Sequence, residues 1–323
     1  MAQLASITLA SSGSLNLSYA SPNTASIGNL WYDNSDNRIK YSYYGSAWSA
    51  GGAMITARSQ LAGAGEQNAG LAFGGDTGNL AWSCTEEYDG TSWTAGGAMI
   101  IARRQLGGAG TQNAGLAFGG QITPSFTRVS CTEEYNGTSW ASGGALSTVR
   151  YSLAGAGTQN AGLAFGGGTP SAVSCTEEYD GSSWASGGAL ITARSQLAGA
   201  GTQNAGLAFG GRLGSPSFTL QSCTEEYDGS SWSSGGALIT ARRQLAGAGT
   251  QNAGLAFSGC SPAGAVSCTE EYNGSLWSVG GALINGRFNL GGTGTQTLAL
   301  AFGGTPALLY TEEYNIGSQI KTL

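Results

Sequence analysis

Short apolar segments alternate with glycine-rich turns along nearly the whole chain, and one such pattern returns six times. In its first full copy, the segments are Leu61–Gly65 (LAGAG), Ala69–Gly75 (AGLAFGG), Ser83–Tyr88 (SCTEEY) and Ser92–Gly97 (SWTAGG). Gln-Asn, Gly-Gly and Asp-Gly or Asn-Gly pairs occur between them, and such pairs are typical of tight turns between short strands. The pattern predicts an all-β chain with four short strands, A to D, in each repeat.

Four anchor residues measure the period of this pattern. Trp precedes the next Arg by 10 residues, Arg precedes Phe by 15, and Tyr precedes the following Trp by 5, whereas the Phe-to-Tyr distance varies from 12 to 18. The resulting period of 44 to 48 residues indicates one supersecondary unit per repeat. Four-stranded units of this length around an axis form a β-propeller. The tryptophan anchors are Trp48, Trp93, Trp140, Trp184, Trp232 and Trp277.

The residue types within the repeat agree with that architecture. Strand A contains mostly Ala and Gly, which suits inner strands that converge on an axis and leave little room for side chains. The Phe, Tyr and Trp anchors are the largest apolar groups of the repeat. We therefore expect their rings to fill the spaces between neighbouring blades, where they bury most area.

The number of blades depends on how the chain ends are interpreted. Trp31 precedes Tyr43 by 12 residues and Trp48 follows Tyr43 by 5, which are the spacings of the last full repeat. Trp31 can therefore correspond to Phe302, and the chain would then begin with a degenerate blade. Seven units of about 46 residues account for almost all of the 323 residues. On this arithmetic we favour seven blades.

The alternative is a propeller of six blades, in which the strand around Trp48 completes the last blade and residues 1–40 form an arm. Residues 1–27 are polar, rich in serine and uncharged. We predict that they serve as an attachment or closure segment and include the start of the degenerate blade. Residues 28–323 are predicted to form the propeller.

Composition and charge narrow the function classes. The chain contains 56 Gly and no His, and its net charge is −6. Without His it lacks the commonest general base, every Ser-His or Cys-His nucleophile, and imidazole metal ligands. Its acidic balance disfavours nucleic acid, which needs basic patches, and no apolar run approaches the ~18 residues of a membrane span. We predict no enzyme, no catalytic residues, no cofactor, no metal, no nucleic-acid partner and no membrane insertion.

Twelve of the 19 acidic residues occur as Glu-Glu pairs before the Tyr anchors, as in Glu86 and Glu87. Adjacent side chains of a strand point to opposite faces, so the two carboxylates of a pair cannot act as a catalytic dyad. We expect one to meet the arginine of the repeat and the other to face solvent or the neighbouring blade. A calcium site is the less favoured alternative, because it would need six or more converging oxygens.

Five of the six cysteines recur once per repeat, at Cys84, Cys131, Cys175, Cys223 and Cys268. Equivalent positions on neighbouring blades are expected to lie too far apart for disulfides. We interpret these cysteines as small buried hydrophobic residues of a chain that folds in a reducing compartment. Cys260 lies outside this register, and a Cys260–Cys268 disulfide is a minor alternative.

Two segments of the chain resemble known proteins. The glycine doublet after the second strand, the Tyr-Asp pair and the Trp five residues after the Tyr resemble the kelch repeat over about residues 48–315. This resemblance implies a propeller of six or seven blades. Residues 28–48 (GNLWYDNSDNRIKYSYYGSAW) resemble short β segments of bacteriophage tail-fibre and other virion proteins, in which near-identical kelch-like repeats also occur. The second resemblance implies a virion structural protein.

All length differences between full repeats fall between strands B and C, in the segment that we call the B–C loop. Loops on a rigid scaffold often carry recognition, and these loops are expected to emerge on one face of the propeller. Exposed aromatic and arginine side chains are typical binding anchors. The candidate recognition residues are therefore Trp82, Phe126, Arg128, Arg212 and Phe218. The alternative is plain loop drift, with these aromatic rings packed against the blade edges.

The function favoured by these observations is a bacteriophage virion structural protein, as a tail fibre, baseplate or capsid-decoration component. It would be assembled in the host cytoplasm, reside in the virion and contact the host surface through the B–C loop face. The expected partners are other virion proteins, further copies of this chain in a symmetric assembly, and a host surface glycan or protein. The alternatives are a carbohydrate-binding, lectin-like propeller and a kelch adaptor that binds a protein partner.

Overall fold

The computed structural model describes residues 4–9, 15–19, 30–33, 38–78 and 80–322, with side chains described over residues 45–78 and 80–317. Two compact units make up the chain: Trp48–Tyr314, and Met1–Ala47 together with Asn315–Leu323. The described residues form strands and turns without a helix. The prediction of an all-β chain is confirmed.

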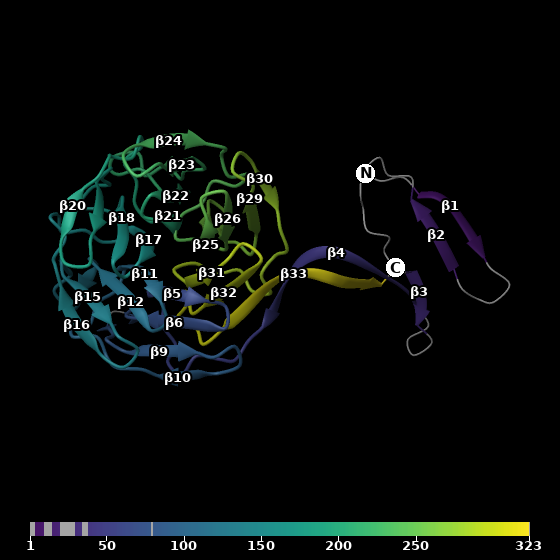
Figure 1. Cartoon of the computed structure of the whole chain (residues 1–323), viewed down its shortest axis with the longest axis horizontal. Helices are drawn as coiled ribbons and strands as arrows, with labels where there is room; N and C mark the ends of the chain where they lie inside the picture. Colours follow the sequence, from purple (N-terminus) through teal and green to yellow (C-terminus); the bar gives the residue numbers. More distant parts are fainter. Residues whose placement is uncertain (1–3, 10–14, 20–29, 34–37, 79, 323) are drawn as a thin grey trace. The chain divides into compact units, whose positions relative to one another are not determined.

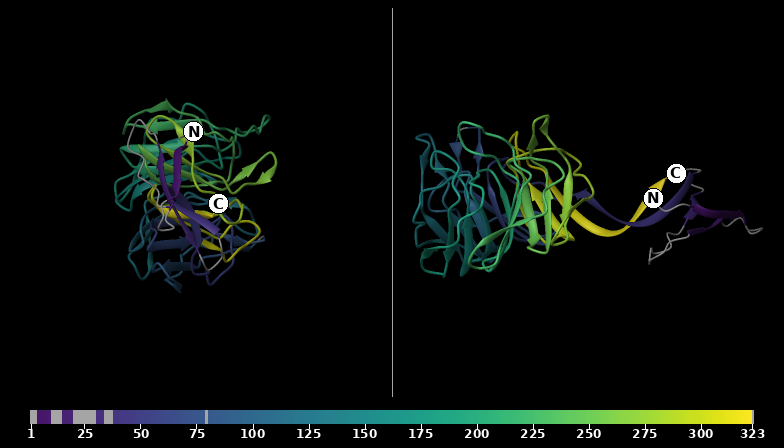
Figure 2. Two further views of the ribbon diagram at one scale, coloured as in Figure 1. Left: turned by 90° about the vertical axis from the view of Figure 1, so that its right-hand side faces the viewer. Right: turned by 90° about the horizontal axis from the view of Figure 1, so that it is seen from above.

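The unit Trp48–Tyr314 is a β-propeller of six blades, each with four antiparallel strands, and the blades are seen edge-on in Figure 2. The innermost strands, A, surround the axis (Figure 1). In order from blade 1 to blade 6, they are β5 (Ala62–Glu66), β11 (Gly107–Thr111), β17 (Ala154–Thr158), β21 (Ala198–Thr202), β25 (Ala246–Thr250) and β31 (Gly291–Gly294), and the lists below follow the same order. The B strands are β6 (Ala69–Phe73), β12 (Ala114–Phe118), β18 (Ala161–Phe165), β22 (Ala205–Phe209), β26 (Ala253–Phe257) and β32 (Leu298–Phe302). The C strands are β9 (Thr85–Tyr88), β15 (Thr132–Tyr135), β19 (Thr176–Tyr179), β23 (Thr224–Tyr227), β29 (Thr269–Tyr272) and β33 (Thr311–Thr322). The outermost strands, D, are β10 (Trp93–Ala95), β16 (Trp140–Gly143), β20 (Trp184–Ser186), β24 (Trp232–Gly235), β30 (Trp277–Val279) and β4 (Arg38–Ala50).

Short hairpins extend three of the B–C loops. They are β7 (Asp76–Thr77) with β8 (Leu80–Ala81), β13 (Gln121–Ile122) with β14 (Thr127–Arg128), and β27 (Cys260–Ser261) with β28 (Gly264–Ala265). In the other unit, β1 (Leu4–Leu9) pairs with β2 (Leu15–Tyr19), and β3 (Leu30–Asp33) pairs with the first residues of β4. Of the predicted attachment segment, residues 1–27, only β1 and β2 lie within the described residues.

The favoured number of seven blades is wrong, and the six-blade alternative is confirmed. The last sheet has the order β3-β4-β33-β32-β31, so β4, which contains Trp48, pairs with β33 and completes the sixth blade. Trp31 lies in β3 and pairs with Lys40 of β4, so it does not take the place of Phe302 in a separate blade. The ring is therefore closed by one strand from the start of the chain and three from its end.

Two lost turns explain why no seventh blade forms. In a full repeat, strands C and D are joined at an Asp-Gly or Asn-Gly turn, where Asp89 Oδ1 accepts a hydrogen bond from the backbone N–H of Ser92 (2.7 Å) and Gly90 has a φ of 92°. Tyr44 replaces the Asp in the first repeat and Ile316 replaces the Gly in the last. A β-branched residue is disfavoured at positive φ, and Tyr lacks the carboxylate or amide oxygen with which Asp or Asn accepts the hydrogen bonds of the turn. Accordingly, β4 and β33 each run straight through this position.

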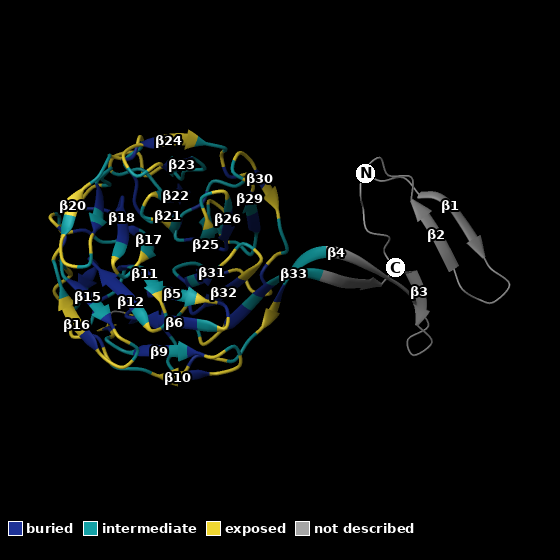
Figure 3. Cartoon of the chain, viewed as in Figure 1, coloured by how far each residue is buried: buried dark blue, intermediate teal, exposed yellow. Residues whose placement is uncertain are grey.

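Small residues allow the inner strands to approach one another closely, as predicted. A Cβ atom on Gly155 of blade 3 would lie 2.5 Å from the carbonyl oxygen of Gly108 in blade 2 and 2.5 Å from Cζ of Phe118. Any larger residue would therefore force the two inner strands apart. Burial is most complete in strands B and C and falls toward the outer residues of strands D (Figure 3).

The aromatic anchors fill the spaces between blades, which confirms that prediction. Between blades 1 and 2, the Trp140 ring lies 5.0 Å from the ring centroid of Phe73, and its Nε1–H donates to Oγ1 of Thr85 (2.9 Å). Every tryptophan anchor donates in this way to a threonine at the start of strand C in the preceding blade. These pairs are Trp48–Thr269, Trp93–Thr311, Trp140–Thr85, Trp184–Thr132, Trp232–Thr176 and Trp277–Thr224.

Replacing Trp48 tests whether β4 closes the ring. Its ring is 7% exposed and lies 5.0 Å from the centroids of both Phe257 and Tyr314. Trp48→Ala should lower the free energy of unfolding by about 3–5 kcal/mol, the usual cost of removing a buried aromatic ring. Urea denaturation of the full-length chain measures it, with Trp140→Ala as the matched control inside the ring. A loss under about 1 kcal/mol for Trp48→Ala alone would contradict closure by β4.

Candidate functional site

A channel lined by the A strands runs along the axis of the propeller, and the B–C loops lie beside one of its mouths. In blade 1, the N–H of Ser59 donates to the carbonyl of Asp76 (2.9 Å), and the N–H of Asp76 donates back (2.8 Å). Ser59 directly precedes the segment that enters strand A, so the loop is tied to the axis. The equivalent pairs are Arg104–Gln121, Tyr151–Gly168, Ser195–Arg212, Arg243–Cys260 and Phe288–Thr305. All six loops therefore share one face with the channel mouth, as expected, and we call it the loop face.

A closed cycle of backbone hydrogen bonds surrounds the channel mouth. Its six residues have φ values between 53° and 59°, and the N–H of each donates to the carbonyl of the equivalent residue in the preceding blade at 2.8 to 3.0 Å. The bond from Gln60 to Asn289 closes the cycle. The members are Gln60, Gln105, Ser152, Gln196, Gln244 and Asn289.

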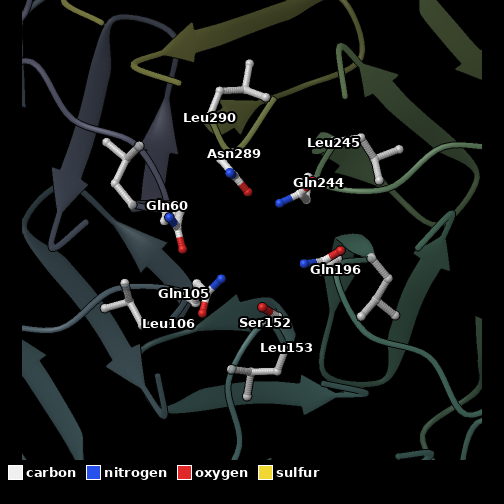
Figure 4. Close-up of a pocket in the computed structure, with 12 residues that line it drawn as sticks. Gln60, Gln105, Leu106, Ser152, Leu153, Gln196, Gln244, Leu245, Asn289 and Leu290 are labelled. Atoms are coloured by element: carbon white, nitrogen blue, oxygen red, sulfur yellow. The ribbon is translucent and has the colours of Figure 1, made fainter. Parts of the chain in front are cut away.

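Polar side chains from this cycle point toward one another across the mouth, and leucines behind them point away (Figure 4). The cavity that they line has a volume of about 110 Å³. Sequence analysis missed these residues. The available signal was the position two residues after each anchor arginine, where Gln, Ser or Asn recurs directly before the leucine that leads into strand A.

One glutamate of each pair is buried with the anchor arginine of its blade, as predicted. In blade 1, Arg58 Nη2 lies 2.9 Å from Glu86 Oε1, and both side chains are buried. Arg58 Nη1 also donates to the carbonyls of Gly74 (2.9 Å) and Cys84 (2.7 Å), which are the two stems of the B–C loop. The other pairs are Arg103–Glu133, Arg150–Glu177, Arg194–Glu225, Arg242–Glu270 and Arg287–Glu312.

The second glutamate faces the neighbouring blade, which was one of the two predicted environments. The hydroxyl of Tyr135 in blade 2 donates to Glu87 Oε1 in blade 1 at 2.5 Å. Burial, followed by this bond to a carboxylate, raises the pKa of Tyr135 to about 12. The same pair of causes raises the pKa to about 12 for Tyr88, Tyr179, Tyr227 and Tyr272. The repeated carboxylates are thus committed to contacts within and between blades.

Two of the predicted recognition residues, Trp82 and Phe126, lie exposed in the loops of blades 1 and 2. Trp82 is 37% exposed, and its Nε1–H donates to Oγ1 of Thr77 in its own loop (2.9 Å). Phe126 is 48% exposed, and its ring centroid lies 5.2 Å from Cζ of Arg104. Arg104 in turn forms a 2.6 Å ion pair with the buried carboxylate of Asp76.

The other three predicted residues lie around a second cavity. Arg212 Cζ is 5.1 Å from the ring centroid of Phe218, which is 51% exposed, and Arg128 Cζ is 5.1 Å from the ring of Tyr151. Arg212, Phe218 and Tyr151 line a cavity of about 230 Å³ between the loops of blades 3 and 4. The structure therefore brings Arg212 and Phe218 together and places Arg128 against the cavity's tyrosine. Trp82 and Phe126 belong to other loops.

Tyr151 is a site residue that sequence analysis missed, because it lies in the scaffold segment rather than in a B–C loop. The position directly after the anchor arginine could have shown it. That position differs in kind from blade to blade, although the residues around it hardly change. It is occupied by Ser59, Arg104, Tyr151, Ser195, Arg243 and Phe288.

Apart from the anchor arginines and the glutamate pairs, the charged side chains that the structure describes are distributed unequally between the two faces of the propeller. A Cβ on Gly90 would lie 3.1 Å from Asn68 Oδ1, so the C–D turn adjoins the A–B turn on the face opposite the loops. The turns of that face carry Glu66, Asp89, Asp180 and Asp228. The loop face carries Arg104, Arg128, Arg212, Arg243 and Asp76. An acidic chain thus presents a cationic face beside its channel mouth.

The cysteines correct one expectation. All six are free thiols, so the alternative Cys260–Cys268 disulfide does not form. The five repeated cysteines are half-buried rather than buried, because each lies at the stem of a B–C loop beside the anchor arginine. Burial raises the pKa of Cys84, Cys131, Cys223 and Cys268. In the part of the chain that the structure describes, no three Cys, Asp or Glu residues are grouped to hold a metal ion, and no helix is long and apolar enough to span a membrane.

Comparison with known proteins gives no match: no protein-family model fits the chain, and no curated protein is significantly similar to it.

Alkaline titration tests the tyrosine–glutamate bonds between blades. A phenol whose pKa is about 12 in the folded chain and about 10 in the unfolded chain stabilises the fold fully below pH 10. That contribution is lost as the pH rises through 12. We expect the free energy of unfolding to fall between pH 10 and 12, together with a rise in tyrosinate absorbance at 295 nm. Tyr135→Phe should be less stable at pH 8 and show a smaller decrease between pH 10 and 12.

The absorbance at 295 nm reports tyrosinate and not thiolate, so it distinguishes ionisation of these phenols from ionisation of the cysteines. If all tyrosines of the folded chain titrated near pH 10 without loss of structure, the bonds to glutamate would be contradicted.

Proposed function

We propose that this chain is a non-enzymatic, kelch-type propeller of a bacteriophage particle that presents its loop face to the host surface. It would serve as a tail-fibre, baseplate or capsid-decoration component, assembled in the host cytoplasm and then carried in the virion. The repeated glycine doublet, Tyr-Asp pair and Trp support the kelch assignment, and residues 28–48 support the phage context.

The observation that carries the proposal is the separation of constant and variable residues. The residues repeated from blade to blade form ion pairs, hydrogen bonds and aromatic contacts within the scaffold. Differences in length occur only in the B–C loops, and these loops share their face with Arg128, Arg212 and Arg243, which form no ion pair among the described residues. Such a division is typical of a rigid support for recognition loops.

The same contacts favour a structural role over catalysis. Of the described arginines, six are buried with a glutamate, and the second glutamates accept hydrogen bonds from tyrosine. The proposed partners are other virion proteins, attached through residues 1–27, and further copies of this chain. A rigid propeller repeated by the symmetry of a particle would multiply weak contacts with a host surface.

Analysis of purified particles tests the proposal. We expect mass spectrometry of gradient-purified virions from the source of this sequence to find the chain at a fixed copy number relative to the major capsid protein. Antibody against the propeller should label particles and reduce adsorption to host cells. The absence of the chain from particles that remain infectious would refute the virion role.

A loop exchange tests the role of the loop face. Residues 212–221 of blade 4 would be replaced by residues 168–173 of blade 3. Because Arg194 holds both loop stems through the carbonyls of Gly210 and Cys223, the free energy of unfolding should change by less than about 1 kcal/mol. Binding of the purified chain to host cells should fall, whereas exchange of the acidic turn residues 228–231 for 136–139 should leave it unchanged. Equal binding by all three proteins would argue against recognition by this loop.

The second candidate is a lectin-like propeller that acts outside a particle. The cavity of about 230 Å³ with its two aromatic rings and an arginine favours it. This candidate shares the loop face with the first and differs in predicting glycan binding by a chain that purified virions lack.

A further inference from the structure

Three arginines of the loop face have no carboxylate partner among the side chains that the structure describes. Between residues 45 and 317 the chain has ten arginines, and seven form ion pairs, six inside the blades and one between Arg104 and Asp76. The remaining three are Arg128, Arg212 and Arg243, which have no ion pair among the described residues. They lack an ion-pair partner although the chain has more acidic than basic residues and a net charge of −6.

Of these three arginines, Arg212 lines one cavity and Arg128 packs on a tyrosine of the same cavity. The guanidinium of Arg128 lies over the ring of Tyr151, and Tyr151 and Arg212 both line the cavity of about 230 Å³. Burial lowers the pKa of Arg212, and the like charge of Arg243 lowers it further. Two like charges held close together cost free energy unless an anion neutralises them.

The residues that line the cavity indicate what kind of anion fits it. Tyr151 and Phe218 contribute aromatic surface, while Ser171, Ser195 and Ser215 contribute hydroxyl groups. None of the described residues that line the cavity is acidic. Its volume is smaller than the roughly 300–1,000 Å³ of pockets for drug-sized ligands, so it suits a single small ring or group.

We propose that this cavity binds one acidic sugar residue of a polysaccharide, with Arg212 holding the carboxylate or sulfate. A guanidinium binds either group through two parallel hydrogen bonds. The apolar C–H face of the sugar ring packs on aromatic surface, and its hydroxyl groups find hydrogen-bond partners in the serines. As an explanation of host attachment, this proposal rests on the proposed function. It names the class of ligand that the loop face would bind.

A second loop of the same sequence offers an internal control. Residues 123–127 (Thr-Pro-Ser-Phe-Thr) and 215–219 (Ser-Pro-Ser-Phe-Thr) are nearly identical, and each phenylalanine stacks on an arginine at 5.1 or 5.2 Å. They differ in charge, because Asp76 neutralises the arginine at Phe126, whereas no carboxylate of the described side chains pairs with the arginine at Phe218. The proposal therefore places binding at Phe218 and not at Phe126.

Calorimetric titration of the full-length chain tests the proposal. The probes are an alginate hexasaccharide, which carries carboxylates, a κ-carrageenan hexasaccharide, which carries sulfates, and neutral maltohexaose. We expect saturable binding of at least one acidic probe, weaker at high salt, and binding of maltohexaose at least about tenfold weaker. The acidic probe that binds identifies the anionic group.

The variants separate the contributions of the cavity. Arg212→Gln and Phe218→Ala should each weaken binding of the acidic probe by about tenfold or more, and Phe126→Ala should leave it unchanged. Thermal unfolding of each variant shows whether it is folded. If Arg212→Gln does not fold, two measurements still test the proposal. They are the binding of the acidic probe by Arg128→Gln and the preference of the unaltered chain for acidic over neutral probes.

Three results would overturn the proposal. They are equal binding of maltohexaose and the acidic probes, equal losses for Phe126→Ala and Phe218→Ala, and no binding of any probe. Sodium sulfate that competes as well as the sulfated hexasaccharide would also overturn it, since the cavity would then hold a simple anion without the sugar. None of these results depends on whether purified virions contain the chain, so failure here is distinct from failure of the virion role.

Discussion

Each blade contains an arginine and a glutamate that have both been removed from water, and such a pair is tolerated only when further hydrogen bonds satisfy both groups. Here the backbone supplies them. Arg58 donates to the carbonyls of Gly74 and Cys84, and Glu86 accepts from the N–H of Ile55 (2.7 Å). One ion pair therefore joins the second strand, the third strand and the connection that arrives from the preceding blade. Loss of either partner would leave a buried charge and release all three.

The position of this pair explains how a nearly constant scaffold carries different loops. Because the guanidinium binds both stems, the chain between them can change in length without moving the strands. The Phe-to-Tyr distance is 14 residues in blade 3 and 18 in blade 4, yet Arg150 and Arg194 bind the corresponding carbonyls at 2.7 to 3.0 Å in both. Closing a somewhat longer loop costs little entropy once its ends are fixed.

Much of this architecture could be predicted from the sequence, because its signals are local and repeated. Gly-Gly and Asp-Gly pairs mark turns, and fixed Tyr-to-Trp spacing marks a hairpin, so the four strands follow directly. The number of blades could not be obtained by dividing the length by the period. It depends on which strand pairs with β33, and the informative residues were single substitutions in a turn, Tyr44 and Ile316. The channel-mouth cycle was hidden because its positive φ values fall on Gln, Ser and Asn rather than on glycine.

The closed cycle at the channel mouth also bears on how such a gene can change. Its repeats are nearly identical, and similar tandem sequences recombine readily, which adds or removes whole units. In this chain each unit already bonds to both neighbours, and the bond from Gln60 to Asn289 leaves no free end where another unit could join. A recombinant with five or seven units would need a different angle between neighbouring blades at every interface. A change within one loop alters none of these interfaces. Geometry thus directs heritable variation away from repeat number and into the loops.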